Sequence, residues 1–237
     1  AHAALSEAAV SFERAGEAEA SQIARCEAWI AAIRRGPRSA YVEAIEALEG
    51  IANAADPSSR VWVIATHYRG TALRFSGDAS GTQAVLLAAL ARSGPYLEER
   101  AQVLSSLGTL YVVLGAYGAA EALLEHAAEL HHQHGDTVGE ALSYGQLGAA
   151  ALGRGDLDRA RRALQMQEWL ASRAGDAFGQ ARALVWLADV ALATGRYDDA
   201  ILHADEASRV AEAQTPPLSM WLAYASRAKA RARGISE

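Results

Sequence analysis

Apolar side chains recur along this chain every three or four residues, in segments divided by short breaks that contain glycine. That spacing places the apolar side chains on one face of an α-helix. The pattern predicts a leading helix at 2–15 and a final helix at 218–233. Between them it predicts five helix pairs, at about 19–35/39–54, 59–76/79–92, 97–114/117–133, 137–153/157–173 and 177–194/197–213. We therefore expect an all-α chain.

The helix pairs repeat with a period of about forty residues, marked by glycines at positions 36, 77, 115, 155, 195 and 234. The clearest copies contain Leu104-x-x-Leu107-Gly108-x-x-Tyr111, Tyr144-x-x-Leu147-Gly148-x-x-Ala151 and Leu184-x-x-Leu187-Ala188-x-x-Ala191. The copies around Gly77 and Gly36 are weaker. A fixed period of this length is typical of a solenoid, in which each unit buries its apolar face only against its neighbours.

Three kinds of residue recur at fixed places within each copy: small residues where two helices cross, glycines that end a helix in the left-handed conformation, and aspartates that cap the next helix. The small residues are Gly108, Gly148 and Ala188 on the first helices and Ala120, Ala160 and Ala200 on their partners. The helix-ending glycines are Gly115, Gly155 and Gly195. The caps are Asp136, Asp156 and Asp176.

These positions resemble the tetratricopeptide repeat (TPR) family, whose helix-turn-helix unit carries W-x-x-L-G-x-x-Y, then A-x-x-x-F, then P. The resemblance covers nearly the whole chain, although most copies lack the proline and the family's unit of about 34 residues is lengthened here to about forty. It implies a right-handed superhelical solenoid of antiparallel helix pairs, with residues 1–237 forming one cooperative array. It also implies that the first helix of each pair lines a concave groove. Lengthened units of this kind are similar to the sensor region of large bacterial signal-transduction-ATPase transcription activators.

The groove that the family implies is lined by first-helix positions just outside the L-G signature. In this sequence those positions are His67, Thr71, Arg74, Gln102, Ser105, Thr109, Gln146, Arg182, Trp186, Asp189, Lys229 and Arg233. The mixture suits an extended peptide or a small polar ligand, because arginines bind carboxylates and Trp186 offers an apolar anchor. A solvated surface without a ligand is the alternative. The clamp of related cochaperones is not reproduced, since Asn53 is the only asparagine in the chain.

The net charge and the cysteine content exclude several classes of binding partner and of site. The chain has 22 basic and 28 acidic side chains, so its net charge of −6 attracts neither nucleic acid nor an anionic membrane. Cys26 is the single cysteine, so an internal disulfide and a thiolate metal cage are both excluded, which fits a reducing cytoplasm. No stretch has the length of apolar residues that a membrane span needs. Because the sequence begins without methionine and ends inside a repeat, we expect a fragment of a longer protein.

The sequence carries no phosphate-binding loop, serine elbow, zinc-protease helix or dinucleotide fingerprint. Four histidines gather near Asp136, namely His126, His131, His132 and His134. His131 and His134 are spaced to share a divalent metal, but a polar helix end whose histidines interact with the negative helix C-terminus explains them as well. We favour that second interpretation and expect neither a metal nor a cofactor. A basic run near the C-terminus fits the same dipole interaction rather than a nucleic-acid site; it comprises Arg227, Lys229, Arg231 and Arg233.

The sequence therefore predicts a non-catalytic, cytoplasmic binding module that recognises a peptide, a protein segment or a small effector. Its signal would pass to domains outside this chain. The alternative is a scaffold or self-association module that forms homo-oligomers through the ends of the solenoid. Metal-dependent hydrolysis at the histidines is a third and more distant hypothesis.

Overall fold

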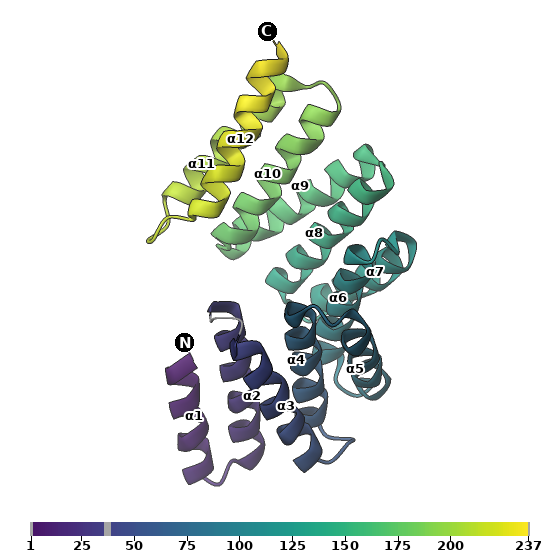
Figure 1. The fold of residues 1–237 in the computed structure, drawn as a ribbon, viewed down its shortest axis with the longest axis vertical. Coiled ribbons are helices and arrows are strands. Elements are labelled where there is room, and N and C mark those ends of the chain that lie inside the picture. Colours follow the sequence, from purple (N-terminus) through teal and green to yellow (C-terminus); the bar gives the residue numbers. More distant parts are fainter. Residues whose placement is uncertain (1, 36–38, 237) are drawn as a thin grey trace. The chain divides into compact units, whose positions relative to one another are not determined.

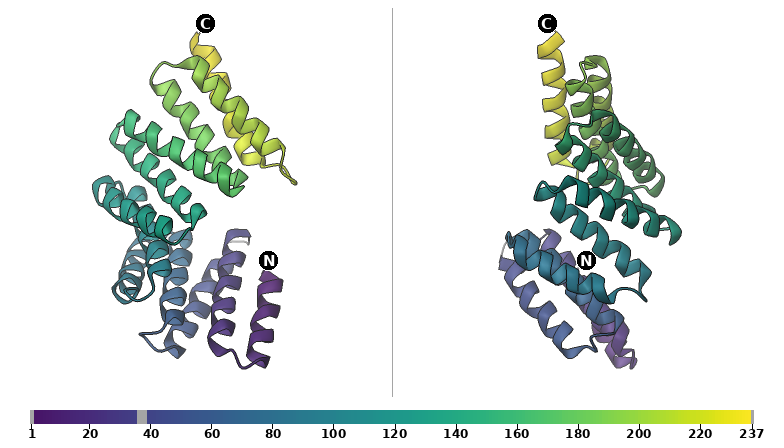
Figure 2. Two further views of the ribbon diagram at one scale, coloured as in Figure 1. Left: turned by 180° about the vertical axis from the view of Figure 1, so that it is seen from behind. Right: turned by 90° about the vertical axis from the view of Figure 1, so that its right-hand side faces the viewer.

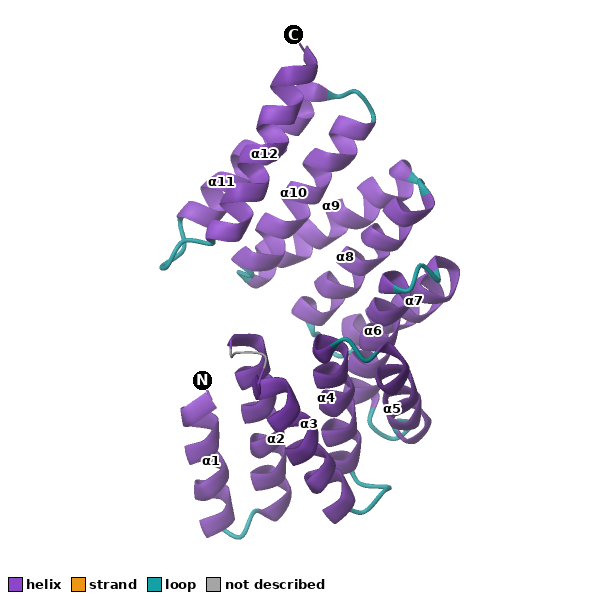
Figure 3. Cartoon of the chain, viewed as in Figure 1, coloured by secondary structure: helices purple, strands orange, loops and turns teal. Residues whose placement is uncertain are grey.

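The structure is a computed structural model that describes residues 2–35 and 39–236, and the described residues form twelve α-helices and no strand (Figures 1 and 3). The helices are α1 (His2–Arg14), α2 (Ala18–Arg35), α3 (Ser39–Ala54), α4 (Arg60–Ser76), α5 (Ala79–Arg92), α6 (Leu97–Val113), α7 (Tyr117–Gln133), α8 (Thr137–Arg154), α9 (Leu157–Ala174), α10 (Ala177–Ala193), α11 (Tyr197–Glu212) and α12 (Ser219–Ser236). They begin and end within one residue of the predicted ranges, except that α12 continues through Gly234. The prediction of an all-α fold is confirmed.

The chain divides into an N-terminal unit, Ala1–Leu110, and a C-terminal unit, Tyr111–Glu237, with the division inside α6. Helices that follow one another in the sequence pack against one another from α1 to α5 in the N-terminal unit and from α7 to α12 in the C-terminal unit. In the C-terminal unit, α12 lies beside both α11 and α10 (Figure 2). The expectation of a single cooperative array over the whole chain stays a prediction.

The core of the N-terminal unit is built from α2, α3 and α4. Cys26, Leu48 and Ala65 are fully buried in one cluster there, with Ile33 and Ala72 beside them. Gly70 on α4 lies against Leu86 of α5, where a Cβ would approach the leucine Cδ2 to 2.7 Å. These contacts are the close helix crossings that the small residues predict.

The buried position of Cys26 makes its thiol chemically inert in the folded state. Burial, helped by the charge of Glu27, raises the pKa of this thiol from 9.0 to about 12. Because the thiolate is the reactive form, we expect no reaction of the folded protein with Ellman's reagent at about pH 8, and complete reaction in guanidinium chloride. The unfolded chain ionises first as the pH rises above 9, so we also expect stability to fall between about pH 9 and pH 12. Rapid labelling of the folded protein would contradict this assignment.

The small residues of the C-terminal unit lie at helix crossings, as predicted. Ala160, Ala188 and Ala200 are fully buried. A Cβ at Gly148 of α8 would lie 2.7 Å from both Cγ and Cδ2 of Leu164 on α9. Glycine at this position therefore sets how closely α8 and α9 pack.

The predicted helix ends and caps of the C-terminal unit are also confirmed. Gly115, Gly155 and Gly195 have φ angles of 75°, 76° and 72°, the left-handed conformation in which glycine is unstrained. The carboxylates of Asp136, Asp156 and Asp176 accept the backbone N–H three residues later, at 2.9, 2.9 and 3.0 Å. Gly234 differs from Gly77, Gly115, Gly155 and Gly195 because it lies inside α12, and Gly36 lies outside the described residues.

One break in the forty-residue register affects the C-terminal end. The first helices α8, α10 and α12 begin at residues 137, 177 and 219, so the last interval is two residues longer than the one before it. The extra length lies in the connection between α11 and α12, which contains Pro216 and Pro217. Residues of α12 are therefore displaced by two positions from a strict forty-residue repeat.

None of the described helices combines the length and apolarity that crossing a membrane requires.

Candidate binding surface on the first helices

The predicted groove residues all lie on the first helices of the pairs, namely α4, α6, α8, α10 and α12. His67, Thr71 and Arg74 follow one another along α4 at intervals of four and three residues. Arg182, Trp186 and Asp189 have the same spacing on α10. Side chains spaced in this way form one stripe along a helix. In each unit, we call the face that these stripes occupy the first-helix face.

In the N-terminal unit, part of the predicted lining is engaged in helix packing. His67 is 6% exposed, and its Nε2 lies 2.8 Å from the Ser106 hydroxyl of α6. The hydroxyls of Thr71 and Thr109 donate to carbonyls one turn earlier in their own helices. His67 therefore links α4 to α6, and the two threonine hydroxyls bond within their own helices, which fits a structural role.

Arg74 is the charged member of the lining in the N-terminal unit. Its guanidinium lies over the ring of Phe75, 4.5 Å from the centroid, and burial lowers its pKa. No described carboxylate pairs with it. Gln102 and Ser105 on α6 are half-buried. Among the predicted lining residues of this unit, Arg74 is thus the one suited to receive an anionic ligand group.

In the C-terminal unit, Arg182 of α10 occupies a similar environment. With the Gln167 amide oxygen turned towards it, Nε and Nη2 of Arg182 donate to that oxygen at 3.0 and 2.6 Å. The guanidinium also lies over Trp186, 5.7 Å from the ring centroid. Burial lowers the pKa of Arg182, and the charge of Asp176 opposes this only in part. No carboxylate in the described parts of the chain forms an ion pair with Arg182.

A hollow of about 290 Å³ lies beside this stripe, between α10 and α12. Its lining consists of Val185, Asp189, Tyr224, Arg227, Ala228 and Arg231. Arg231 donates to Asp189 across it at 3.0 Å, and Arg227 lies over the Tyr224 ring. Burial raises the pKa of Asp189, while Arg231 and Arg227 act in the opposite direction. The hollow thus presents two cations and one carboxylate around a small apolar floor.

Lys229 and Arg233, the predicted groove residues of α12, do not line this hollow. Lys229 pairs with Asp205 of α11, so it faces the second helix of the preceding pair. The reason is the two-residue shift in register described above, which puts Arg231 where a strict forty-residue offset from Asp189 predicts Lys229. Arg233 lies one turn beyond Lys229 on the same side of α12. The basic residues that do face α10 are Arg227 and Arg231, which belong to the C-terminal basic run expected to interact with the helix dipole.

Gln146 of α8 is half-buried and lies where the forty-residue offset predicts it, in register with Trp186 of α10.

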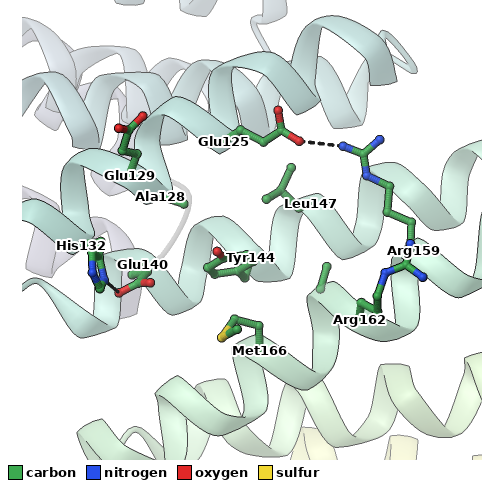
Figure 4. A pocket seen from close by; sticks show the side chains of 11 residues that line it. Glu125, Ala128, Glu129, His132, Glu140, Tyr144, Leu147, Arg159, Arg162 and Met166 are labelled. Carbon is green, nitrogen blue, oxygen red and sulfur yellow. Dashed lines mark hydrogen bonds and ion pairs between the residues drawn. The ribbon is translucent and has the colours of Figure 1, made fainter.

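Sequence reasoning missed a larger pocket in the C-terminal unit, with a volume of about 570 Å³ (Figure 4). It is formed by α7, α8 and α9, and its lining is Glu125, Ala128, Glu129, His132, Glu140, Tyr144, Leu147, Arg159, Arg162, Ala163 and Met166. On α8 the lining residues form one stripe, and Gln146 lies about 130° around the helix from it. The pocket and the first-helix face therefore use different sides of α8. The spacing of Glu140, Tyr144 and Leu147 predicts that they form a stripe along one face of α8. That this stripe lines a pocket depends on how α7 and α9 are oriented beside α8, which the sequence does not give.

The histidines at the end of α7 are divided between packing and the surface. His131 is 3% exposed, and its Nδ1 lies 2.8 Å from a carboxylate oxygen of Asp136, the cap of α8. His132 is exposed and lies 3.2 Å from Glu140. Within residues 2–35 and 39–236, no three His, Cys, Asp or Glu side chains are grouped to hold a metal ion. The contact of His131 fits a structural link between α7 and α8.

Comparison with known proteins agrees with this fold. The chain matches no protein-family model and no curated protein. BtubC (BKLC) from P. vanneervenii is similar in structure, with a TM-score of 0.64, 18% sequence identity, and coverage of 88% of this chain and 89% of that one. A kinesin light chain-like protein from Podosopora anserina with nearly identical TPR-like repeats has a TM-score of 0.58 and 14% identity, with coverage of 87% and 93%. The fold is thus a TPR-like helical repeat.

Proposed function

We propose that the chain is a non-catalytic binding module that recognises a peptide, a protein segment or a small effector through its first-helix face. The observation that carries this proposal is the environment of the Arg74 and Arg182 guanidinium groups, which lack ion-pair partners in the part of the chain that the structure describes. Both are half-buried on that face, each lies over an aromatic ring, and neither forms an ion pair with a carboxylate among the described residues. A guanidinium that is partly desolvated and has no ion-pair partner is unfavourable, and a ligand carboxylate would relieve this with charge-assisted hydrogen bonds.

The surroundings of Arg182 add specificity to the proposed site. Trp186 lies on the same stripe of α10 and offers an apolar surface for a ligand side chain. In the hollow between α10 and α12, Arg231 and Asp189 form an ion pair that a ligand of either charge can replace. The helices hold these groups in place before binding, so a ligand has little scaffold ordering to oppose its affinity.

A random-peptide library selected against the whole chain tests the proposal. We expect the selected peptides to carry acidic side chains or a free C-terminal carboxylate. Arg182→Met or Arg74→Met keeps the apolar stem and removes the charge, and we expect one of these changes to weaken each peptide at least about tenfold. Arg173→Met is the matched control, because Arg173 stacks on Trp169 of the second helix α9. Peptides that bind all three variants as well as the unchanged chain would contradict the proposal.

We also propose that this module is the sensor part of a larger bacterial transcription regulator that acts in the cytoplasm. The support is the lengthened repeat of about forty residues, together with a single cysteine. The sequence around this segment in the complete gene product tests the idea. A phosphate-binding loop upstream and a helix-turn-helix downstream would support it, and their absence would count against it.

The alternative function is self-association through the ends of the repeat. Large apolar side chains are exposed near the C-terminal end, including Leu202 and Met220, at 66% and 50% exposure. Light scattering after size-exclusion chromatography separates the two functions. A concentration-dependent dimer that persists after His67, Arg74 and Arg182 are replaced would favour association through the ends.

A further inference from the structure

The pocket formed by α7, α8 and α9 has the composition of a recognition site for a chain segment. Its floor is apolar and consists of Ala128, Tyr144, Leu147, Ala163 and Met166. Met166 is 38% exposed, a large apolar side chain open to solvent. The volume of about 570 Å³ is enough to receive a bulky side chain and the backbone on either side of it.

Charges of opposite sign lie at opposite ends of this floor. Figure 4 shows Glu129, His132 and Glu140 at one end, with Tyr144 and Leu147 in the middle. At the other end it shows Arg162, together with Arg159 and its ion-pair partner Glu125. The acidic groups come from α7 and α8, and both arginines come from α9. A ligand that follows the floor therefore meets a negative end first and a positive end last.

Two of these charged groups lack an opposite charge inside the described structure. Arg159 pairs with Glu125 at 2.7 Å and with Glu121 at 3.1 Å, so its charge is already balanced. Glu140 lies 3.2 Å from His132. Glu129, by contrast, accepts only from the neutral Gln133 amide, and Arg162 has no ion pair with a described residue. The acidic end thus has room for a cation, and the basic end has room for a carboxylate.

The dimensions of the floor fit an extended chain. On α8, the stretch from Glu140 to Leu147 covers about 10 Å along the helix axis. In an extended peptide, alternate side chains face the same side, and three of them span about 13 Å. A Lys-x-Leu-x-Glu segment therefore places a cation, an apolar group and a carboxylate on one side, in the order that the pocket presents.

We propose that this pocket is a second recognition site, which binds an extended segment of a partner protein with a bulky aliphatic side chain between a Lys or Arg and an Asp or Glu. The aliphatic side chain packs on Tyr144, Leu147 and Met166. The cation lies by Glu129 and the carboxylate by Arg162. Each exposed charge contributes little alone, so recognition depends on all three contacts being made along one chain. The site lies on the other side of α8 from Gln146 and does not depend on the proposed function of the first-helix face.

Methionine-methyl NMR tests this proposal directly, because the chain has two methionines and only Met166 lines the pocket. The probe is the peptide Ac-Gly-Lys-Ser-Leu-Ser-Glu-Gly-NH2, titrated into the whole chain with ¹³C-labelled methionine methyl groups. We expect a saturable shift of the Met166 resonance and none of Met220, which lies on α12. A probe with glycine in place of leucine should bind at least about tenfold more weakly, since it leaves the apolar floor uncovered.

Charge variants of the protein complete the test. We expect Arg162→Glu and Glu129→Lys each to weaken the probe about fivefold, and Arg173→Glu, a control at an exposed position of α9, to leave its affinity unchanged. Glu129→Lys should in turn favour a probe with glutamate in place of lysine. Arg182→Met should have no effect, which separates this site from the first-helix face. Equal shifts of both methionines, unchanged affinity in both charge variants, or a Met166 shift that follows protein concentration without peptide would overturn the proposal.

Discussion

Replacing Leu164 by alanine is expected to lower the free energy of unfolding by about 2–5 kcal/mol, because Leu164 is fully buried between α8 and α9. The more informative result concerns Gly148, whose added Cβ would lie 2.7 Å from Leu164. In the unchanged chain, Gly148→Ala should destabilise by up to about 2 kcal/mol, since overpacking outweighs the gain in helix propensity. In the Leu164→Ala background the same change should stabilise by up to about 1 kcal/mol, because the obstructing side chain is gone.

Urea unfolding of the four proteins, followed by circular dichroism, measures this coupling as a double-mutant cycle. Gly118→Ala is the control. Gly118 lies in the first turn of α7, and a Cβ there would have no neighbour within 4 Å. It should be neutral or slightly stabilising. If Gly148→Ala changed the free energy of unfolding equally with and without Leu164, the close crossing of α8 and α9 would not explain why a small residue recurs at this position of the repeat.

The fold was predictable because each repeat carries local signals that act over a few residues. A left-handed glycine such as Gly155 ends its helix regardless of what packs around it. The Asp156 cap likewise needs only the backbone three residues ahead. These signals recur every forty residues and agree with the apolar period, so local and global preferences coincide.

The candidate sites were only partly predictable, because they depend on how helices rotate against one another. The connection before α12 is two residues longer than the repeat predicts, so Arg231, and not Lys229, lies opposite Asp189. A prediction that carries positions forward by forty residues does not take this extra length into account. The pocket on α7, α8 and α9 needs three helices in register before its lining comes together. The sequence places His131 at a polar helix end, yet the structure buries it in contact with Asp136, in the turn into α8.

In the turn between α7 and α8, replacing Asp136 is expected to cause the second large loss in the free energy of unfolding. One carboxylate oxygen of Asp136 accepts the Gly139 N–H at 2.9 Å and so caps α8, and the other lies 2.8 Å from Nδ1 of the buried His131. Asp136→Ala therefore removes a helix cap, worth about 0.5–2 kcal/mol, and leaves a buried ring nitrogen without its partner, at about 1–3 kcal/mol. We expect a total loss of about 2–4 kcal/mol in the free energy of unfolding.

Asp156→Ala provides the matched comparison, because Asp156 caps α9 by accepting the Arg159 N–H at the same distance, and the structure gives its carboxylate no buried histidine partner. Its loss should stay within the range of a single cap, about 0.5–2 kcal/mol. A urea unfolding series on both variants measures the difference. The double variant His131→Ala and Asp136→Ala should lose less than the sum of the two single changes, since the histidine–carboxylate contact is then counted once. If the two losses instead add fully, or if Asp136→Ala and Asp156→Ala are equally destabilising, His131 and Asp136 do not act together to fix the turn between α7 and α8.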